Sequence, residues 1–146
     1  MNKILPLLLS LGLVSGLAHA DASDIKARQQ YMKEWGGLSK KMGAMVKNGS
    51  AADFPAKEFA RLAAQMGETA KEPWQHYDAG SRGAGSEAKA AVWEKPQEFE
   101  AAIRRFTQAV DKLQTASRGG RYDDVKAAFG QVGQSCKACH DKFKED

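Results

Sequence analysis

Apolar residues recur at alternating spacings of three and four along four stretches of the chain, a pattern that predicts helices burying one face. The first helix is expected to begin at Ser23 or Asp24 as its N-cap and to end at Asn48-Gly49, a left-handed stop signal. Its core-facing positions are Ile25, Arg28, Met32, Trp35, Ser39, Met42 and Val46. An arginine and a serine therefore stand among the apolar positions of this helix.

Three further helices follow the same rule. The second begins at Asp53 with Pro55 in its first turn and ends before Pro73, the third runs from about residue 97 to Gly119-Gly120, and the fourth begins at about residue 123. The predicted core positions are Phe59, Leu62, Ala63 and Met66 in the second helix, Phe99, Ile103, Phe106, Val110 and Leu113 in the third, and Val125, Phe129, Val132, Cys136, Cys139 and Phe143 in the fourth.

These helices define an all-α fold, because no stretch shows the alternation of a strand. Two of the three connections are short, which favours antiparallel neighbours, whereas residues 72–96 form a long connection containing three glycines. The sequence therefore predicts an up-down-up-down four-helix bundle with one long connection between the second and third helices.

The beginning of the chain has the three parts of a secretory signal peptide. A basic start, Met1-Asn2-Lys3, precedes an apolar run at residues 4–17 and an Ala18-His19-Ala20 cleavage site. The run is too short for a membrane span, and no later stretch is apolar enough to be one. We expect cleavage after Ala20, one domain at residues 21–146, no membrane insertion, and export to a bacterial periplasm.

The charge of the chain narrows its partners. The 146 residues carry a net charge of +4. That charge is too mild to indicate nucleic-acid binding, and no basic stripe with interleaved aromatic residues supports it. No nucleophile with a base and an orienting group is visible either, so we do not expect an enzyme.

The strongest chemical signal is Cys136-Lys137-Ala138-Cys139-His140, a C-x-x-C-H haem-attachment motif. Two thiols three residues apart share a helix face and can form thioethers to one haem, while His140 becomes an axial iron ligand. Both cysteines occupy core positions, so the haem would lie between helices. A disulfide, a redox dithiol and a zinc site are the alternatives, although zinc lacks ligands because only His76 remains in residues 21–146.

Several segments resemble one known family. The matching elements are Arg28-Gln29-Gln30-Tyr31-Met32, Pro73-Trp74, Val92-Trp93 and the run from Ala127-Ala128-Phe129-Gly130 through the haem motif to Phe143. Together they resemble the class II c-type cytochromes, specifically the cytochrome c′ family, over essentially all of residues 21–146. The final segment is the most specific of the four.

The resemblance implies a role for each matching residue around one covalently attached haem c. Cys136 and Cys139 would carry the thioethers, His140 would be the proximal ligand, and Lys144 would lie over that histidine. Arg28 would lie near a haem propionate, which also fits its position physically, because a buried guanidinium needs an anionic partner. The alternative for Arg28 is an ordinary exposed arginine at the edge of the helix.

Met32 decides between two functions. By resemblance it faces the distal side of the iron, where an apolar lid leaves a five-coordinate, high-spin site open to NO and CO. If its sulfur binds the iron instead, the protein is a low-spin electron carrier. Met32 could also merely fill the core. The resemblance favours the lid. Trp74 would pack near the haem or be plain core, and His76 is expected to be exposed.

Two surfaces are candidates for protein partners. A redox partner protein could dock near the haem edge on Lys137, Lys142 and Lys144, which could equally be solubilising surface. The resemblance also implies a homodimer paired through the first two helices. A second stripe there, Tyr31, Leu38 and Met45, could face a partner or could widen the core of a monomer.

Overall fold

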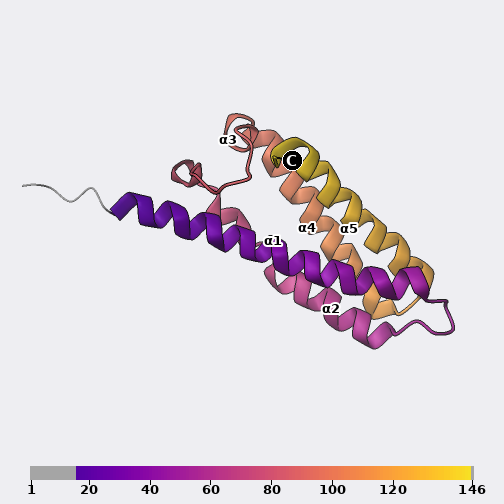
Figure 1. Ribbon diagram of the computed structural model, residues 1–146. Helices are drawn as coiled ribbons and strands as arrows, with labels where there is room; N and C mark the ends of the chain where they lie inside the picture. Colours follow the sequence, from indigo (N-terminus) through magenta and orange to yellow (C-terminus); the bar gives the residue numbers. More distant parts are fainter. Residues whose placement is uncertain (1–15, 146) are drawn as a thin grey trace, which may run out of the picture.

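The computed structural model describes residues 16–145, in which four long helices lie side by side as a bundle (Figure 1). They are α1 (Gly16–Asn48), α2 (Ala56–Thr69), α4 (Pro96–Gly119) and α5 (Tyr122–Phe143). The described residues contain no strand, only an isolated antiparallel bridge between Ala88 and Lys144. The predicted all-α four-helix bundle is confirmed.

The beginning of α1 differs from the prediction. The helix begins at Gly16 rather than at Ser23, so it includes the last residues of the predicted signal peptide. Leucine and alanine at residues 17–20 favour helix, and no breaker separates them from residue 23. Most of the predicted signal peptide, residues 1–15, lies outside the described residues. Within residues 16–145, no helix combines the length and apolar character that a membrane crossing requires.

Two helix ends show different stopping mechanisms. At the end of α4, Gly120 adopts a left-handed φ of 70°, and its N–H bonds the carbonyl oxygens of Ala116 and Ser117, as its sequence predicts. The helix α1 ends at Asn48, as predicted, but Gly49 is not left-handed, which corrects the predicted mechanism of the stop. There the Tyr122 hydroxyl donates to the carbonyls of Val46 and Gly49, at 2.7 and 2.9 Å, and so caps the helix end.

The main core fills the space between the helices. All four core positions predicted on α2 are buried, and so are five of the seven predicted on α1; Met32 and Ser39 are half-buried. The largest fully buried side chains include Phe59, Met42, Leu62, Met66 and Leu113. The packing is uneven, since α5 packs most extensively on α4 and contacts α1 much less.

The long connection covers one end of the bundle. It contains the short helices η1 (Pro73–His76), η2 (Ala79–Ser81) and α3 (Ala91–Glu94). The helix α3 lies near the end of α5 (Figure 1), whereas η1 and η2 pack against α1. Val92, Phe99, Ala102 and Phe143 form a second, smaller core beneath it. Trp74 packs against both cores and so links the connection to the bundle.

Candidate haem site

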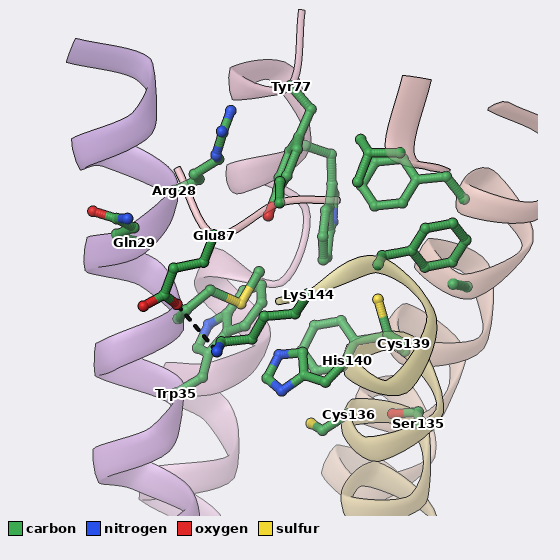
Figure 2. A pocket seen from close by; sticks show the side chains of 18 of the residues that line it. Arg28, Gln29, Trp35, Tyr77, Glu87, Ser135, Cys136, Cys139, His140 and Lys144 are labelled. Atoms are coloured by element: carbon green, nitrogen blue, oxygen red, sulfur yellow. Dashed lines mark ion pairs between the residues drawn. The ribbon is translucent and has the colours of Figure 1, made fainter. Parts of the chain in front are cut away.

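A cavity of about 510 Å³ opens between α1, α4, α5 and the connection (Figure 2). This volume lies in the usual range of cofactor pockets. The cavity is lined by every site residue that the sequence predicts: Arg28, Met32, Trp74, Cys136, Cys139, His140 and Lys144. The fold thus brings together residues from opposite ends of the chain.

The α5 wall of the cavity carries the haem motif. Cys136 and Cys139 are half-buried free thiols, and the His140 imidazole projects from α5 into the space beside them (Figure 2). The structure therefore gives no support to a disulfide. It gives none to zinc either, because the described residues contain no group of three or more His, Cys, Asp or Glu side chains that could hold a metal ion.

Burial sets the protonation of these groups. It raises the pKa of Cys139 to about 11 and raises the pKa of Cys136 as well. Burial, followed by the positive charge of Lys144, lowers the pKa of His140. At neutral pH the wall therefore presents two protonated thiols and a neutral imidazole. A thiol adds across a vinyl C=C bond with no oxidant, and only a neutral imidazole has a lone pair for iron.

The opposite wall is apolar and aromatic. Met32 is half-buried and packs against the main core beside Trp35. The ring of Trp74 lies 5.8 Å from that of Trp35 and 5.9 Å from that of Phe106, and its Nε1–H donates to the Ala70 carbonyl at 2.8 Å. These contacts fix Trp74 in place at the cavity.

Arg28 ties α1 to the connection. It is only 3% exposed, and its guanidinium donates to the His76 carbonyl, the Ser81 hydroxyl and carbonyl, and the Ser86 hydroxyl, at 2.6 to 2.9 Å. Its carbon Cζ lies 4.5 Å from the centre of the Tyr77 ring. Arg28 is therefore buried, as expected, but its hydrogen bonds go to neutral acceptors and no carboxylate replaces the expected anion.

The mouth of the cavity is closed on one side by a strap, which we define as residues 83–89. The strap pairs with the end of α5 through two hydrogen bonds, from Lys89 N to the Phe143 carbonyl and from Glu145 N to the Glu87 carbonyl. The Lys144 ammonium lies 3.2 Å from the Glu87 carboxylate. Figure 2 marks this ion pair. Lys144 thus passes close to His140 while neutralising an acidic group.

The structure corrects one surface expectation and bears on a second. His76 is not exposed: its Nδ1 lies 2.7 Å from the Asp24 carboxylate, and its ring stacks on Tyr31. Within the described residues, each of the three lysines expected near the haem edge has an acidic partner: Lys137 with Asp141, Lys142 with Glu98 and Lys144 with Glu87. That surface is therefore close to electrically balanced.

The second stripe of α1 is used largely within the chain. Leu38 is buried in the main core, Met45 packs at the edge of that core, and Tyr31 stacks on His76. This arrangement matches the widened-core interpretation of the stripe.

Three polar cavity residues were missed by the sequence reasoning. Tyr77, whose hydroxyl points into the cavity in Figure 2, stands in a loop without periodicity, although its place after Pro73-Trp74 was a signal. Glu87 also lies in that loop, and no pattern marks it. Lys33 directly follows Met32 on α1, so its proximity to the cavity follows from helix geometry once Met32 is placed there.

The residues present fit a covalently held haem. One wall offers two thiols and an imidazole in the C-x-x-C-H order, the other is apolar, and cationic side chains stand at the rim. When bound, a haem would supply the iron centre for ligand binding and one-electron chemistry.

Comparison with known proteins agrees with this fit. The profile of the cytochrome C′ family matches residues 23–144. Cytochrome c′ from Rubrivivax gelatinosus is 44% identical over 95 residues, which cover 64% of this chain and 74% of that protein.

Solved structures extend the likeness to three dimensions. A crystal structure of the Rubrivivax gelatinosus protein superposes with a TM-score of 0.80 at 36% identity, covering 86% of this chain and 97% of that one. A nitric oxide complex of a variant of Alcaligenes xylosoxidans cytochrome c prime gives 0.80 at 26% identity, with the same coverage. A carbon-monoxide-bound variant of that protein gives 0.79. The chain therefore belongs to the cytochrome c′ family, whose members bind one covalently attached haem c.

Proposed function

We propose that the protein is a non-enzymatic monohaem cytochrome c′ that binds NO and CO at an open iron site and exchanges single electrons. The observation that carries the proposal is the cavity itself, with the haem motif on α5 facing an apolar wall that includes Met32 on α1. Small neutral gases suit an apolar site, because they need no polar partner to enter it.

Three residues of the motif would hold the haem. The thiols of Cys136 and Cys139 would form thioethers with its vinyl groups, the sulfur bonding one vinyl carbon and the thiol hydrogen going to the other. His140 would supply a nitrogen ligand to the iron. The support from relatives is that structures of the Alcaligenes xylosoxidans protein variants contain NO and CO.

Met32 acts as a lid in this proposal. Its packing against the main core beside Trp35 supports a fixed apolar side chain that narrows access without bonding iron. The alternative is a low-spin, six-coordinate His/Met cytochrome that serves purely as an electron carrier. That alternative needs the Met32 sulfur to bond the iron.

Substitution of Met32 separates the two functions. If Met32 is a lid, Met32→Ala should speed CO association by about tenfold, equivalent to a barrier lower by about 1.4 kcal/mol. If Met32 is a ligand, the native protein should not bind CO, and only the Met32→Ala variant should bind it. Met45→Ala is the matched control, since Met45 is half-buried on the same helix but does not line the cavity.

The setting of the protein is part of the proposal. Export to a periplasm is supported by the signal-peptide pattern at residues 1–20. A homodimer through α1 and α2 would have to use positions other than the buried Leu38. Light scattering of the purified protein tests the dimer, and the mass of the mature chain tests cleavage after Ala20.

A further inference from the structure

Four lysines on α1 form a row along one edge of the helix. Lys26, Lys33, Lys40 and Lys47 recur every seven residues, and all four side chains are exposed. Seven helical residues advance about 10 Å and return nearly to the same direction, so the row is about 30 Å long. We call these four residues the lysine row.

The lysine row carries charge that the described residues do not neutralise. None of its members has a carboxylate within salt-bridge distance among residues 22–145, where every ion pair belongs to other basic side chains. The lysines beside the haem motif are different, since Lys137, Lys142 and Lys144 are each paired. The lysine row therefore adds positive charge beside the cavity that the described residues leave unpaired.

The row leads to the mouth of the cavity. Lys33 and its neighbour Gln29 line the cavity, so the row meets the site within its own length. A partner seated on this edge would stand beside the cavity opening.

The surface between the lysines is polar or bare. Gln29, Gly36 and Gly37 are exposed there, and no large apolar side chain accompanies them. Helices that bind membranes bury a face of leucine, phenylalanine or tryptophan in the lipid, and this edge has none. An extended row of positive charge instead matches a carboxylate-rich protein face, which it can attract over the whole row.

We propose that the lysine row is the docking surface for an acidic electron-transfer protein. This inference rests on the proposed function, because the partner exchanges one electron with the haem that the cavity holds. The row sets the orientation in which the acidic face meets the cavity mouth, and it raises the association rate.

The test compares two variants of equal net charge. The row variant carries Lys26→Gln, Lys40→Gln and Lys47→Gln, which leaves Lys33 and the cavity intact. The control variant changes three exposed lysines that also lack an ion pair in the described part of the chain: Lys57→Gln, Lys71→Gln and Lys112→Gln.

The probe is oxidised plastocyanin, a copper protein with a carboxylate-rich face. Stopped-flow absorbance follows one electron leaving the reduced protein and converting copper(II) to copper(I). At about 10 mM ionic strength, where charges act over about 30 Å, the row variant should react about tenfold more slowly than the native protein. The control variant should react within about twofold of the native rate, and the differences should vanish at about 0.5 M salt.

Other outcomes overturn the proposal. If electron transfer slows equally in both variants, only net charge matters. If it slows in neither, the lysine row is not a docking surface. Loss of binding to phosphatidylglycerol vesicles by the row variant, with an unchanged electron-transfer rate, would assign the row to a membrane. The haem spectrum and CO binding of each variant are recorded separately, so failure of the proposed function is seen independently of the row.

Discussion

Replacement of Arg28 by methionine should release the long connection from α1. The change keeps an apolar stem in the helix but removes a charged donor that bonds four acceptors. Three of these acceptors keep another partner, because the Ser81 hydroxyl still bonds the Asp78 carbonyl and donates to the His76 carbonyl, and the Ser86 hydroxyl still accepts from Ala88 N. The Ser81 carbonyl is left buried without its side-chain donor.

The expected cost follows from this inventory. An orphaned buried carbonyl costs about 1–3 kcal/mol, and the lost bonds to a charged donor contribute further. Arg28→Met should therefore lower the free energy of unfolding by about 4 kcal/mol, a large part of the stability of a small domain. Residues 76–86 should also become more sensitive to proteases, since their tether to α1 is gone.

Urea unfolding of the haem-loaded protein, followed by circular dichroism, measures the change. Arg61→Met is the matched control: Arg61 also makes hydrogen bonds of 2.6 and 2.7 Å, to Glu58, but on the exposed surface of α2. Its removal should hardly move the urea midpoint, because water replaces an exposed pair. If Arg28→Met shifts the midpoint no more than Arg61→Met does, the assignment of Arg28 as the tether is refuted.

Three other substitutions give expected outcomes. Burial raises the pKa of Tyr77 from 10.0 to about 12, so the native protein should lose stability relative to Tyr77→Phe as the pH rises from about 10 to 12. Phenolate absorbance and urea midpoints, both measured against pH, check this. Stability curves of the two proteins that run parallel over this pH range would contradict it. Gly120→Ala should destabilise the protein by about 1 kcal/mol, because residue 120 has a left-handed φ. Gly119→Ala should be neutral or stabilising, because open space surrounds the position of the added Cβ. Thermal melts that rank the two variants in the opposite order would overturn this prediction. Phe59→Ala should cost about 3–5 kcal/mol in chemical unfolding, because Phe59 is fully buried, and a cost below about 1 kcal/mol would be inconsistent with this core.

The helices and much of the core were predictable because their pattern is local. Phe59, Leu62, Ala63 and Met66 are all buried as their spacing requires, and Gly120 ends α4 as its freedom at positive φ allows. The haem motif was equally clear, because its chemistry resides in five consecutive residues. Such signals depend only on a short stretch of chain, so they can be recognised without knowing which other elements pack against it.

The connection was not predictable, because its position depends on partners distant in sequence. His76 was expected to be exposed, but Asp24, 52 residues earlier in the chain, pairs with it. The ion pair of Glu87 with Lys144 similarly joins a loop to the end of α5, and nothing in the sequence around either residue indicates its partner. The end of α1 was placed correctly, but its cause was missed for the same reason, since Tyr122 caps that helix from another element.

The central claim is that iron held by His140 stays open on the side of Met32. The most direct measurement is the optical spectrum of the purified protein, first oxidised, then reduced with dithionite, then exposed to CO. The account predicts a broad, unsplit visible band on reduction and a sharp Soret change with CO. Split, narrow low-spin bands that do not respond to CO would contradict it, because a side chain would then occupy the sixth position of the iron.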